Sequence, residues 1–238
     1  MSQCSMIRGP KIVVVYTYAL AGANGYRDKA LQFVDSYNRH PPGLDHETVI
    51  VCNGIPANDD TRVIFASLPG LAFLDHDDSG WDIGAFQKAA REIPCDLMVF
   101  CGGHTYFRKP NWLARMWEVY ATYGNTLYGS TGNQGNIGIG VHPHVRTTGF
   151  WCHPSLMNEY PHRIVMQGGG GDRYQFEHGD TCISNWVRRQ GLTPWIVGFQ
   201  EMAPLMNCDS LPHGYHKNSQ DDLLVGDRMT MPPFYHCP

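Results

Sequence analysis

The chain has 238 residues, of which 42% are hydrophobic and 17% charged, and its formal net charge is −4. These values are typical of a packed globular domain, so they exclude a largely disordered chain. Lys and Arg total 18 against 22 Asp and Glu, and no basic block is present, so we expect no nucleic-acid partner.

The cysteines and the N-terminal segment indicate a cytoplasmic protein. None of the eight cysteines forms a C-x-x-C pair, and several lie in apolar runs, as Cys101 does, where buried free thiols are expected. Free thiols are typical of a reducing compartment. Arg8 and Lys11 precede an apolar stretch over 12–23 that imitates a signal peptide, but Tyr16 and its neighbours interrupt it. No segment reaches the roughly 20 apolar residues of a membrane span, so we expect none.

Strand and helix patterns alternate through the first half of the chain. The opening run KIVVVYTY is β-branched and aromatic, as in a buried parallel strand, and apolar residues recur at helical spacing in the segment after it. Strands are predicted over 11–18, 46–52, 63–65, 71–74 and 96–101, and helices over 26–39, 82–93 and 111–123. The alternation predicts an α/β domain with a mostly parallel central sheet and helices on both faces.

The second half is less regular. Residues 126–140 are rich in Gly, Asn and Thr, and 168–171 are four glycines that form either a mobile loop or a plain surface turn. A helix is predicted over 180–190 and a last strand over 193–199. Prolines then interrupt the pattern, so we expect a single domain that ends in an irregular tail over 201–238.

Several polar segments directly follow predicted strands. Ligands of open parallel sheets gather at the carboxyl ends of the strands, which puts residues 16–19, 53–54, 75–80 and 102–105 at one edge. The acidic segment LDHDDSGWDIGAFQKAA crosses this edge. Asp82 within it can accept a hydrogen bond from a uracil N–H or a ribose hydroxyl, whereas the alternative is a solvated loop in which Asp82 caps the helix.

The order of five segments resembles a known family. SGWDIGAF is similar to the N-x-G-x-D-x-G-A segment of bacterial polysaccharide glycosyltransferases, and DLMVFCGGHTYF stands where their metal-binding D-x-D follows a strand. KIVVVYTY, HVRTTGFWCHPSLM and FEHGDTCISNWVRRQG are similar to further parts of these enzymes. The resemblance covers residues 11–200 and is to family 2 and rhamnan-synthesis-type enzymes of the GT-A fold. It implies a nucleotide-binding part over 11–125 and an acceptor and catalytic part over 126–200.

The turn at 101–104 departs from this family, because it reads CGGH. The family places two carboxylates there to hold Mn²⁺ or Mg²⁺ against the diphosphate, and hard cations prefer oxygen ligands. His104 is a single metal ligand, a cationic donor to the diphosphate or a structural residue, and the glycine amides can bind phosphate. Use of Mn²⁺ or Mg²⁺ therefore stays open. The expected donor-binding residues are Thr17, Tyr18, Asp82, Gly102, Gly103 and His104.

Residues 177–180, EHGD, carry the expected base. An inverting transferase needs a carboxylate that deprotonates the acceptor hydroxyl as this hydroxyl attacks the anomeric carbon. The resemblance puts this role on Glu177, with Asp180 as the second choice; the alternatives are a structural salt bridge for Glu177 and a helix cap for Asp180. His178 is a metal ligand, a diphosphate donor or a core residue.

The segment HPHVRTTGFW is expected on the acceptor side. Arg146 can hold an acceptor oxygen or the leaving diphosphate, and Trp151 is either a sugar-stacking platform or part of the core. His142 and His144 point to one face of a strand, and they can share a metal only if the strand bends.

Together these features predict a glycosyltransferase that moves a sugar from a UDP- or dTDP-sugar to a carbohydrate or glycoconjugate hydroxyl, with inversion, in polysaccharide or glycoconjugate synthesis. The alternative is an inactive nucleotide- or sugar-binding relative, which the missing D-x-D favours. A third hypothesis is a metal-dependent hydrolase that uses the histidines.

Overall fold

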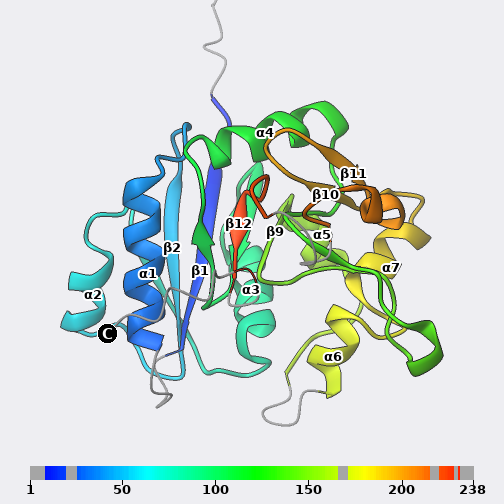
Figure 1. Ribbon diagram of the computed structural model, residues 1–238. Helices are drawn as coiled ribbons and strands as arrows, with labels where there is room; N and C mark the ends of the chain where they lie inside the picture. Colours follow the sequence, from blue (N-terminus) through cyan, green and yellow to red (C-terminus); the bar gives the residue numbers. More distant parts are fainter. Residues whose placement is uncertain (1–8, 20–25, 166–170, 215–219, 228–229, 231–238) are drawn as a thin grey trace, which may run out of the picture.

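The computed structural model describes residues 9–19, 26–165, 171–214, 220–227 and 230. An eight-stranded sheet in the order β11-β10-β6-β9-β4-β1-β2-β3 runs through its centre (Figure 1). These strands are β1 (Ile12–Ala19), β2 (Glu47–Asn53), β3 (Ala72–His76), β4 (Leu97–Cys101), β6 (Tyr128–Gly129), β9 (Gly149–Cys152), β10 (Trp195–Val197) and β11 (Met202–Pro204). β1 to β4 pair in parallel, as do β6 and β10, whereas β9 and β11 are antiparallel to their neighbours. The expected α/β class with a mostly parallel sheet is therefore confirmed.

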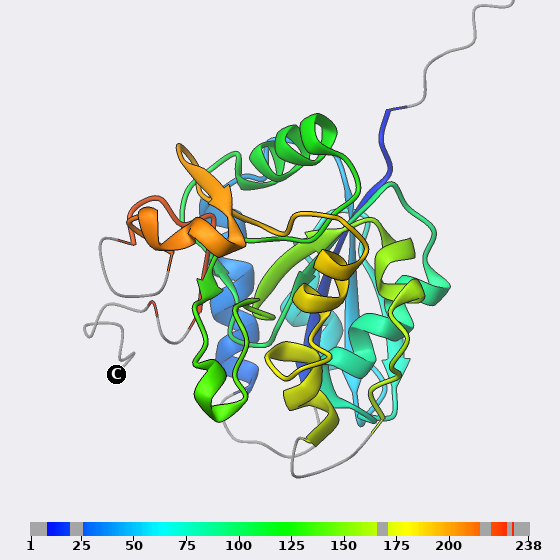
Figure 2. The ribbon, with the colours of Figure 1, turned by 90° about the vertical axis from the view of Figure 1, so that its right-hand side faces the viewer.

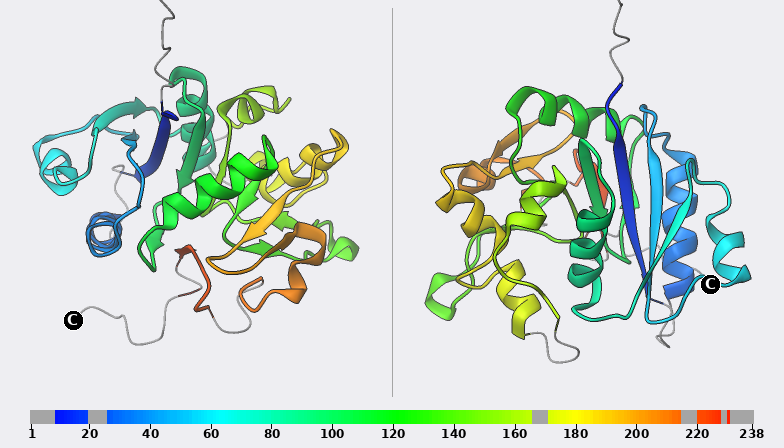
Figure 3. Two further views of the ribbon diagram at one scale, coloured as in Figure 1. Left: turned by 90° about the horizontal axis from the view of Figure 1, so that it is seen from above. Right: turned by 180° about the vertical axis from the view of Figure 1, so that it is seen from behind.

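Helices cover both faces of the sheet. The helices on one face are α1 (Tyr26–Arg39), α2 (Asp59–Phe65) and α4 (Trp112–Tyr123), and those on the other are α3 (Trp81–Glu92), α5 (Pro154–Glu159), α6 (Gly171–Glu177) and α7 (Ile183–Arg189). Alternation along β1 explains the two cores, because Val13 and Val15 point to the α3 side while Tyr16 stacks on Phe33 of α1. Figure 1 draws α1 in front of the sheet, and the rear view in Figure 3 draws α3 in front.

The strand predicted over 63–65 is wrong, because these residues form the last turn of α2. The helix begins earlier, at a cap that the prediction missed: the Asn58 side chain accepts a hydrogen bond from the Thr61 amide (2.9 Å). Asp59 and Asp60 in the first turn further favour a helix there. The apolar residues of 63–65 therefore belong to a helix face that packs Phe65 into the core.

The second half adds short elements rather than long ones. They are β5 (Tyr106–Phe107), β7 (Gly132–Asn133), the 3₁₀ helix η1 (Ile137–Ile139), β8 (His144–Val145), the 3₁₀ helix η2 (Leu205–Ser210) and β12 (Val225–Gly226). Within the expected irregular tail, β11 extends the main sheet and β12 pairs with β5, so residues 202–204 and 225–226 of this segment form regular strands. Figure 2 shows α6 and α7 on one side of the molecule with the η1 loop beside them.

Two further expectations from the sequence concern the glycine run and a membrane span. The glycine run at 168–171 lies outside the described residues except for Gly171, which begins α6. Among the helices of the described ranges, none is long and apolar enough to cross a membrane.

Candidate functional site

The carboxyl ends of β1 and β4 meet in a close-packed turn. The Gly102 amide donates a hydrogen bond to the Thr148 carbonyl (3.0 Å). A Cβ on Gly102 would stand 3.8 Å from a carboxylate oxygen of Asp82, and a Cβ on Gly103 would stand 3.6 Å from the Thr17 carbonyl. The structure therefore brings the backbone of Thr17, the Asp82 carboxylate and the two glycines to one edge of the sheet.

Asp82 connects this edge to the second half of the chain. It lies at the start of α3, whose N-cap is Gly80, so Asp82 does not cap the helix. Its Oδ1 is 3.3 Å from Nε of Arg173 on α6, and the guanidinium also lies over the Trp81 ring at 5.1 Å. Burial raises the pKa of Asp82, and the attraction of Arg173 offsets this only in part. The Asp82 carboxylate is thus partly shielded from water and lies beside the Arg173 guanidinium.

Glu177, the last residue of α6, is the centre of a polar network. Its Oε1 accepts a hydrogen bond from the Thr147 hydroxyl (3.0 Å) and lies 3.8 Å from Nε of Arg146. Its Oε2 lies 3.8 Å from Nδ1 of His178. Arg146 in turn approaches Asp227, with its guanidinium nitrogen 3.7 Å from the carboxylate. One half-buried carboxylate is therefore in reach of a hydroxyl, a guanidinium and an imidazole.

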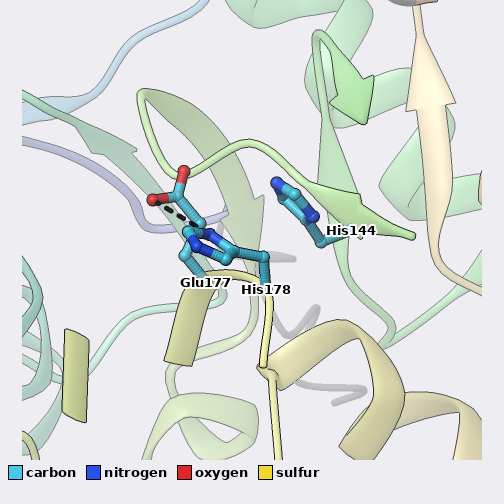
Figure 4. Close-up of side chains that lie close together, drawn as sticks. All are labelled: His144, Glu177 and His178. Carbon is cyan, nitrogen blue, oxygen red and sulfur yellow. Dashed lines mark ion pairs between the residues drawn. The ribbon is translucent and has the colours of Figure 1, made fainter. Parts of the chain in front are cut away.

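His144 on β8 completes a group of possible metal ligands with Glu177 and His178. One ligand atom from each side chain lies within 4.8 Å of the others, and Figure 4 shows His144 across from the two residues at the end of α6. Nδ1 of His144 is 2.7 Å from the carbonyl oxygen of His142. Burial lowers the pKa of both His144 and His178. The possible metal ligands of this group come from β8 and from the end of α6, two elements that are distant in the sequence.

The charges of this site do not balance. Three carboxylates, from Asp82, Glu177 and Asp227, face the two guanidinium groups of Arg146 and Arg173. Counted over these described groups alone, and with neutral histidines, the net charge is −1. In addition, Nε of each arginine is buried and has no hydrogen-bond partner among the described residues. Both Nε atoms therefore lie in ion pairs with carboxylates but make no hydrogen bond, and among the described groups the carboxylates outnumber the guanidinium groups.

Two of the residues that were expected to bind the nucleotide-sugar donor lie at the margin of this site. His104 is half-buried at the turn, with its ring centroid 6.2 Å from that of Tyr26. Tyr18 belongs to the core on the α1 side, where it packs edge-on against Phe65 (5.4 Å). The side chain of Tyr18 is thus part of the core, and His104 is not one of the three grouped ligands.

Two further expected residues lie elsewhere. Asp180 is 81% exposed, and its carboxylate pairs with Nε2 of His142 at 2.5 Å. Trp151 on β9 is fully buried, and its ring stacks parallel to that of Tyr128 at 5.7 Å. The sugar-stacking role of Trp151 is therefore corrected to a core role, because a side chain with no exposed surface offers no face to a sugar.

The sequence did not point to Arg173, Asp227 or Thr147. Arg173 lies two residues after the glycine run, and Asp227 lies in the segment expected to be irregular. Asp227 reaches the site because β12 pairs with β5, and it lines a small polar pocket with Thr148 and Thr131. The only available signal was the position of Arg173 one turn before Glu177 on one helix, which puts both on one face.

No protein-family model matches this chain, and no curated protein matches its sequence. The structure is similar to that of the galactosyltransferase LgtC in complex with donor and acceptor sugar analogues, at 14% identity over 69% of this chain and 70% of that chain, with a TM-score of 0.46. It is also similar to the mannosyltransferase PcManGT from Pyrobaculum calidifontis in complex with GDP-Man and Mn²⁺, at 13% identity over 65% and 48% of the two chains, with a TM-score of 0.48.

A third similar structure is residues 1–349 of S. aureus TarS in complex with UDP-GlcNAc, at 14% identity over 63% of this chain and 47% of that chain, with a TM-score of 0.44. This chain therefore spans about half the length of the mannosyltransferase and TarS chains. With TM-scores below 0.5, these likenesses assign no activity to the chain.

Proposed function

We propose that this protein is a GT-A-fold glycosyltransferase that moves a sugar from a UDP- or dTDP-sugar to an acceptor hydroxyl with inversion. The observation that carries the proposal is the junction of Asp82, Gly102 and Arg173 beside Glu177. This junction lies at the carboxyl ends of the parallel strands, where open α/β sheets bind nucleotides. It also lies beside the Glu177 carboxylate, which can accept a proton.

Asp82 and the turn at 102–104 form the donor side of the proposed site. The Asp82 carboxylate accepts hydrogen bonds from the base or the ribose. Because the Gly102 amide already donates to Thr148, phosphate binding at this turn relies on the amide of Gly103. His104 adds an imidazole donor at the same place.

Glu177 is the proposed base on the acceptor side. The acceptor oxygen attacks the anomeric carbon, its proton passes to the Glu177 carboxylate, and the sugar–phosphate bond breaks to release the nucleoside diphosphate. Arg146 and Arg173 each have a buried Nε without a hydrogen bond, and their guanidinium groups can stabilise the charge of the departing diphosphate. Asp180 suits the role less well, because it is exposed and already paired with His142.

The sequence resemblance supports the finer parts of the proposal. It suggests a carbohydrate or glycoconjugate acceptor and a place in polysaccharide or glycoconjugate synthesis, while the cysteine pattern of the sequence supports a cytoplasmic location. A second function, a nucleotide- or sugar-binding protein without transfer, is favoured by one observation: the turn at 101–104 offers no carboxylate for a hard cation.

The test is a thermal-shift panel of UDP, dTDP, GDP and their sugars, each with and without Mn²⁺. A nucleotide at 100 times its Kd stabilises the native state by about 2.7 kcal/mol, or about 5–10 °C for a chain of this size. Transfer is then measured as release of the nucleoside diphosphate in the presence of a panel of acceptor sugars. Binding of a nucleotide without release of the diphosphate supports the second function. The absence of stabilisation by any nucleotide or nucleotide sugar contradicts the proposed transferase.

A further inference from the structure

The group formed by His144, Glu177 and His178 has the composition of a transition-metal site rather than that of a hard-cation site. Two imidazoles and one carboxylate suit zinc and its neighbours, whereas Mg²⁺ and Ca²⁺ take oxygen ligands almost exclusively. The turn at 101–104, where the resembled family holds its metal, supplies no carboxylate here. The possible metal ligands of this chain therefore lie together at a different place, at β8 and the end of α6.

The orientation of His144 is already that of a metal ligand. A carbonyl oxygen can only accept, so the 2.7 Å contact between Nδ1 of His144 and the His142 carbonyl requires the proton on Nδ1. This leaves the lone pair of Nε2 free to bind a metal. A second ring nitrogen that donates to a backbone carbonyl is the usual way in which proteins fix the tautomer of a metal-binding histidine.

The second ligand pair is held by α6. Glu177 keeps Oε1 in the hydrogen bond from Thr147, while Oε2 is on the side of His178. Oε2 can therefore bind an ion without breaking the Thr147 contact. The three ligand atoms lie within 4.8 Å of one another, and tetrahedral zinc needs them about 3.4 Å apart, so small side-chain rotations close the site.

The charge of the surroundings also favours a dication. The carboxylates of Asp82, Glu177 and Asp227 exceed the guanidinium groups of Arg146 and Arg173 by one charge. A divalent ion changes the net charge of this group from −1 to +1. A net positive site binds a diphosphate more readily than a net negative one.

We propose that His144, Glu177 and His178 bind one divalent transition-metal ion of the zinc class. Metal binding itself does not depend on the function proposed above. One consequence rests on that function: a carboxylate that ligates a metal is not available to accept a proton, so zinc bound here inhibits a transferase in which Glu177 is the base.

The test uses the full chain, stripped of metal with a chelator and titrated with Zn²⁺ by calorimetry and with Co²⁺ by visible absorption. We expect one equivalent of each ion and a Co²⁺ spectrum of nitrogen and oxygen ligands. His144→Ala and His178→Ala each weaken Zn²⁺ binding by at least about 10-fold, since even the loss of an outer partner costs that much. His162→Ala, an exposed histidine outside the group, keeps wild-type affinity.

Three results would overturn the proposal. They are the absence of stoichiometric binding in the wild-type chain, unchanged affinity in both histidine variants, and a thiolate-to-cobalt charge-transfer band, which would place the metal on cysteines. If an alanine variant fails to fold, Glu177→Gln, which keeps size and shape, gives the same comparison. Transfer assays separate the two proposals: stoichiometric zinc that activates transfer keeps the metal site and removes Glu177 as the base.

Discussion

Replacement of Asp82 by Asn separates the binding role of this carboxylate from its effect on stability. The substitution keeps the size of the side chain and keeps an oxygen that can accept from the Ile83 amide, as Oδ1 does now at 3.1 Å. It removes the negative charge beside Arg173. If Asp82 holds a nucleotide, the loss of a charged hydrogen-bond acceptor costs about 1.5–3 kcal/mol, or about 10-fold to 150-fold in Kd.

Stability is expected to change in the opposite direction. At 3.3 Å the attraction between Asp82 and Arg173 is about 5 kcal/mol at an effective dielectric constant of 20 and about 1 kcal/mol at 80. The raised pKa of Asp82 means that burial outweighs this attraction. The Arg173 side chain is 36% exposed, so water solvates it when its partner is neutral. We therefore expect Asp82→Asn to be as stable as the wild type at pH 7, or more stable by up to about 1 kcal/mol.

The pH dependence gives an independent check. A carboxyl whose pKa is higher in the folded than in the unfolded protein binds more protons when folded, so its contribution to stability falls as pH rises from its ordinary value of 3.8 to the folded pKa. Asp82→Asn lacks this contribution, so the unfolding free energy of the variant should gain on that of the wild type across this window. Urea unfolding at several pH values and calorimetric nucleotide titration measure the two effects. A variant that is clearly less stable than the wild type and binds nucleotide normally would refute the assignment.

Four other substitutions test the site and the residues that support it. Glu177→Gln should lower kcat by about 100-fold to 10,000-fold and leave nucleotide affinity within a few-fold, while Asp180→Asn stays near wild type; the reverse pattern in diphosphate-release assays would move the base to Asp180. Trp151→Ala should lower the unfolding free energy by about 3–5 kcal/mol, as expected for a core residue, whereas a surface platform would change acceptor KM with little loss of stability. Gly80→Ala should destabilise the fold by at least about 1 kcal/mol in thermal melts, because its φ is +72° and its Cβ would stand 2.2 Å from the Ile164 carbonyl oxygen; an unchanged melting temperature would contradict this geometry.

The first half of the fold could be predicted from the sequence because its signals are local. The β-branched run of β1 and the helical spacing of α1 both fall within single elements, and the bounds of α1 agree with the prediction. The error over 63–65 arose where three apolar residues were considered without the Asn58 cap before them. In the second half, two-residue strands such as β6 and β12 depend on partners far along the chain, and no local pattern specifies them.

The site was predictable only residue by residue. Asp82 and Glu177 stood out because each lies in a recognisable segment. Their contacts, of Asp82 with Arg173 and of Glu177 with Thr147, arise from packing between elements. Asp227 was hidden for the same reason, since only the pairing of β12 with β5 brings it to Arg146. Sequence patterns indicate which residue types are present, whereas partner, tautomer and burial are properties of the folded chain.

The excess of acid in the site determines how the two proposals bear on each other. A diphosphate needs positive charge, yet the three carboxylates outnumber the two guanidinium groups. If Glu177 takes up the acceptor proton, the five groups become neutral only as the reaction proceeds, and the leaving diphosphate relies on the guanidinium groups of Arg146 and Arg173. If a metal ion binds Glu177 instead, the positive charge is present before the donor arrives and the base must be another group, for which Asp82 is a candidate, because burial raises its pKa and it lies close enough to Glu177 for the two charges to interact. Nucleotide affinity measured with and without zinc therefore distinguishes these two arrangements, because only the second predicts that the metal tightens donor binding.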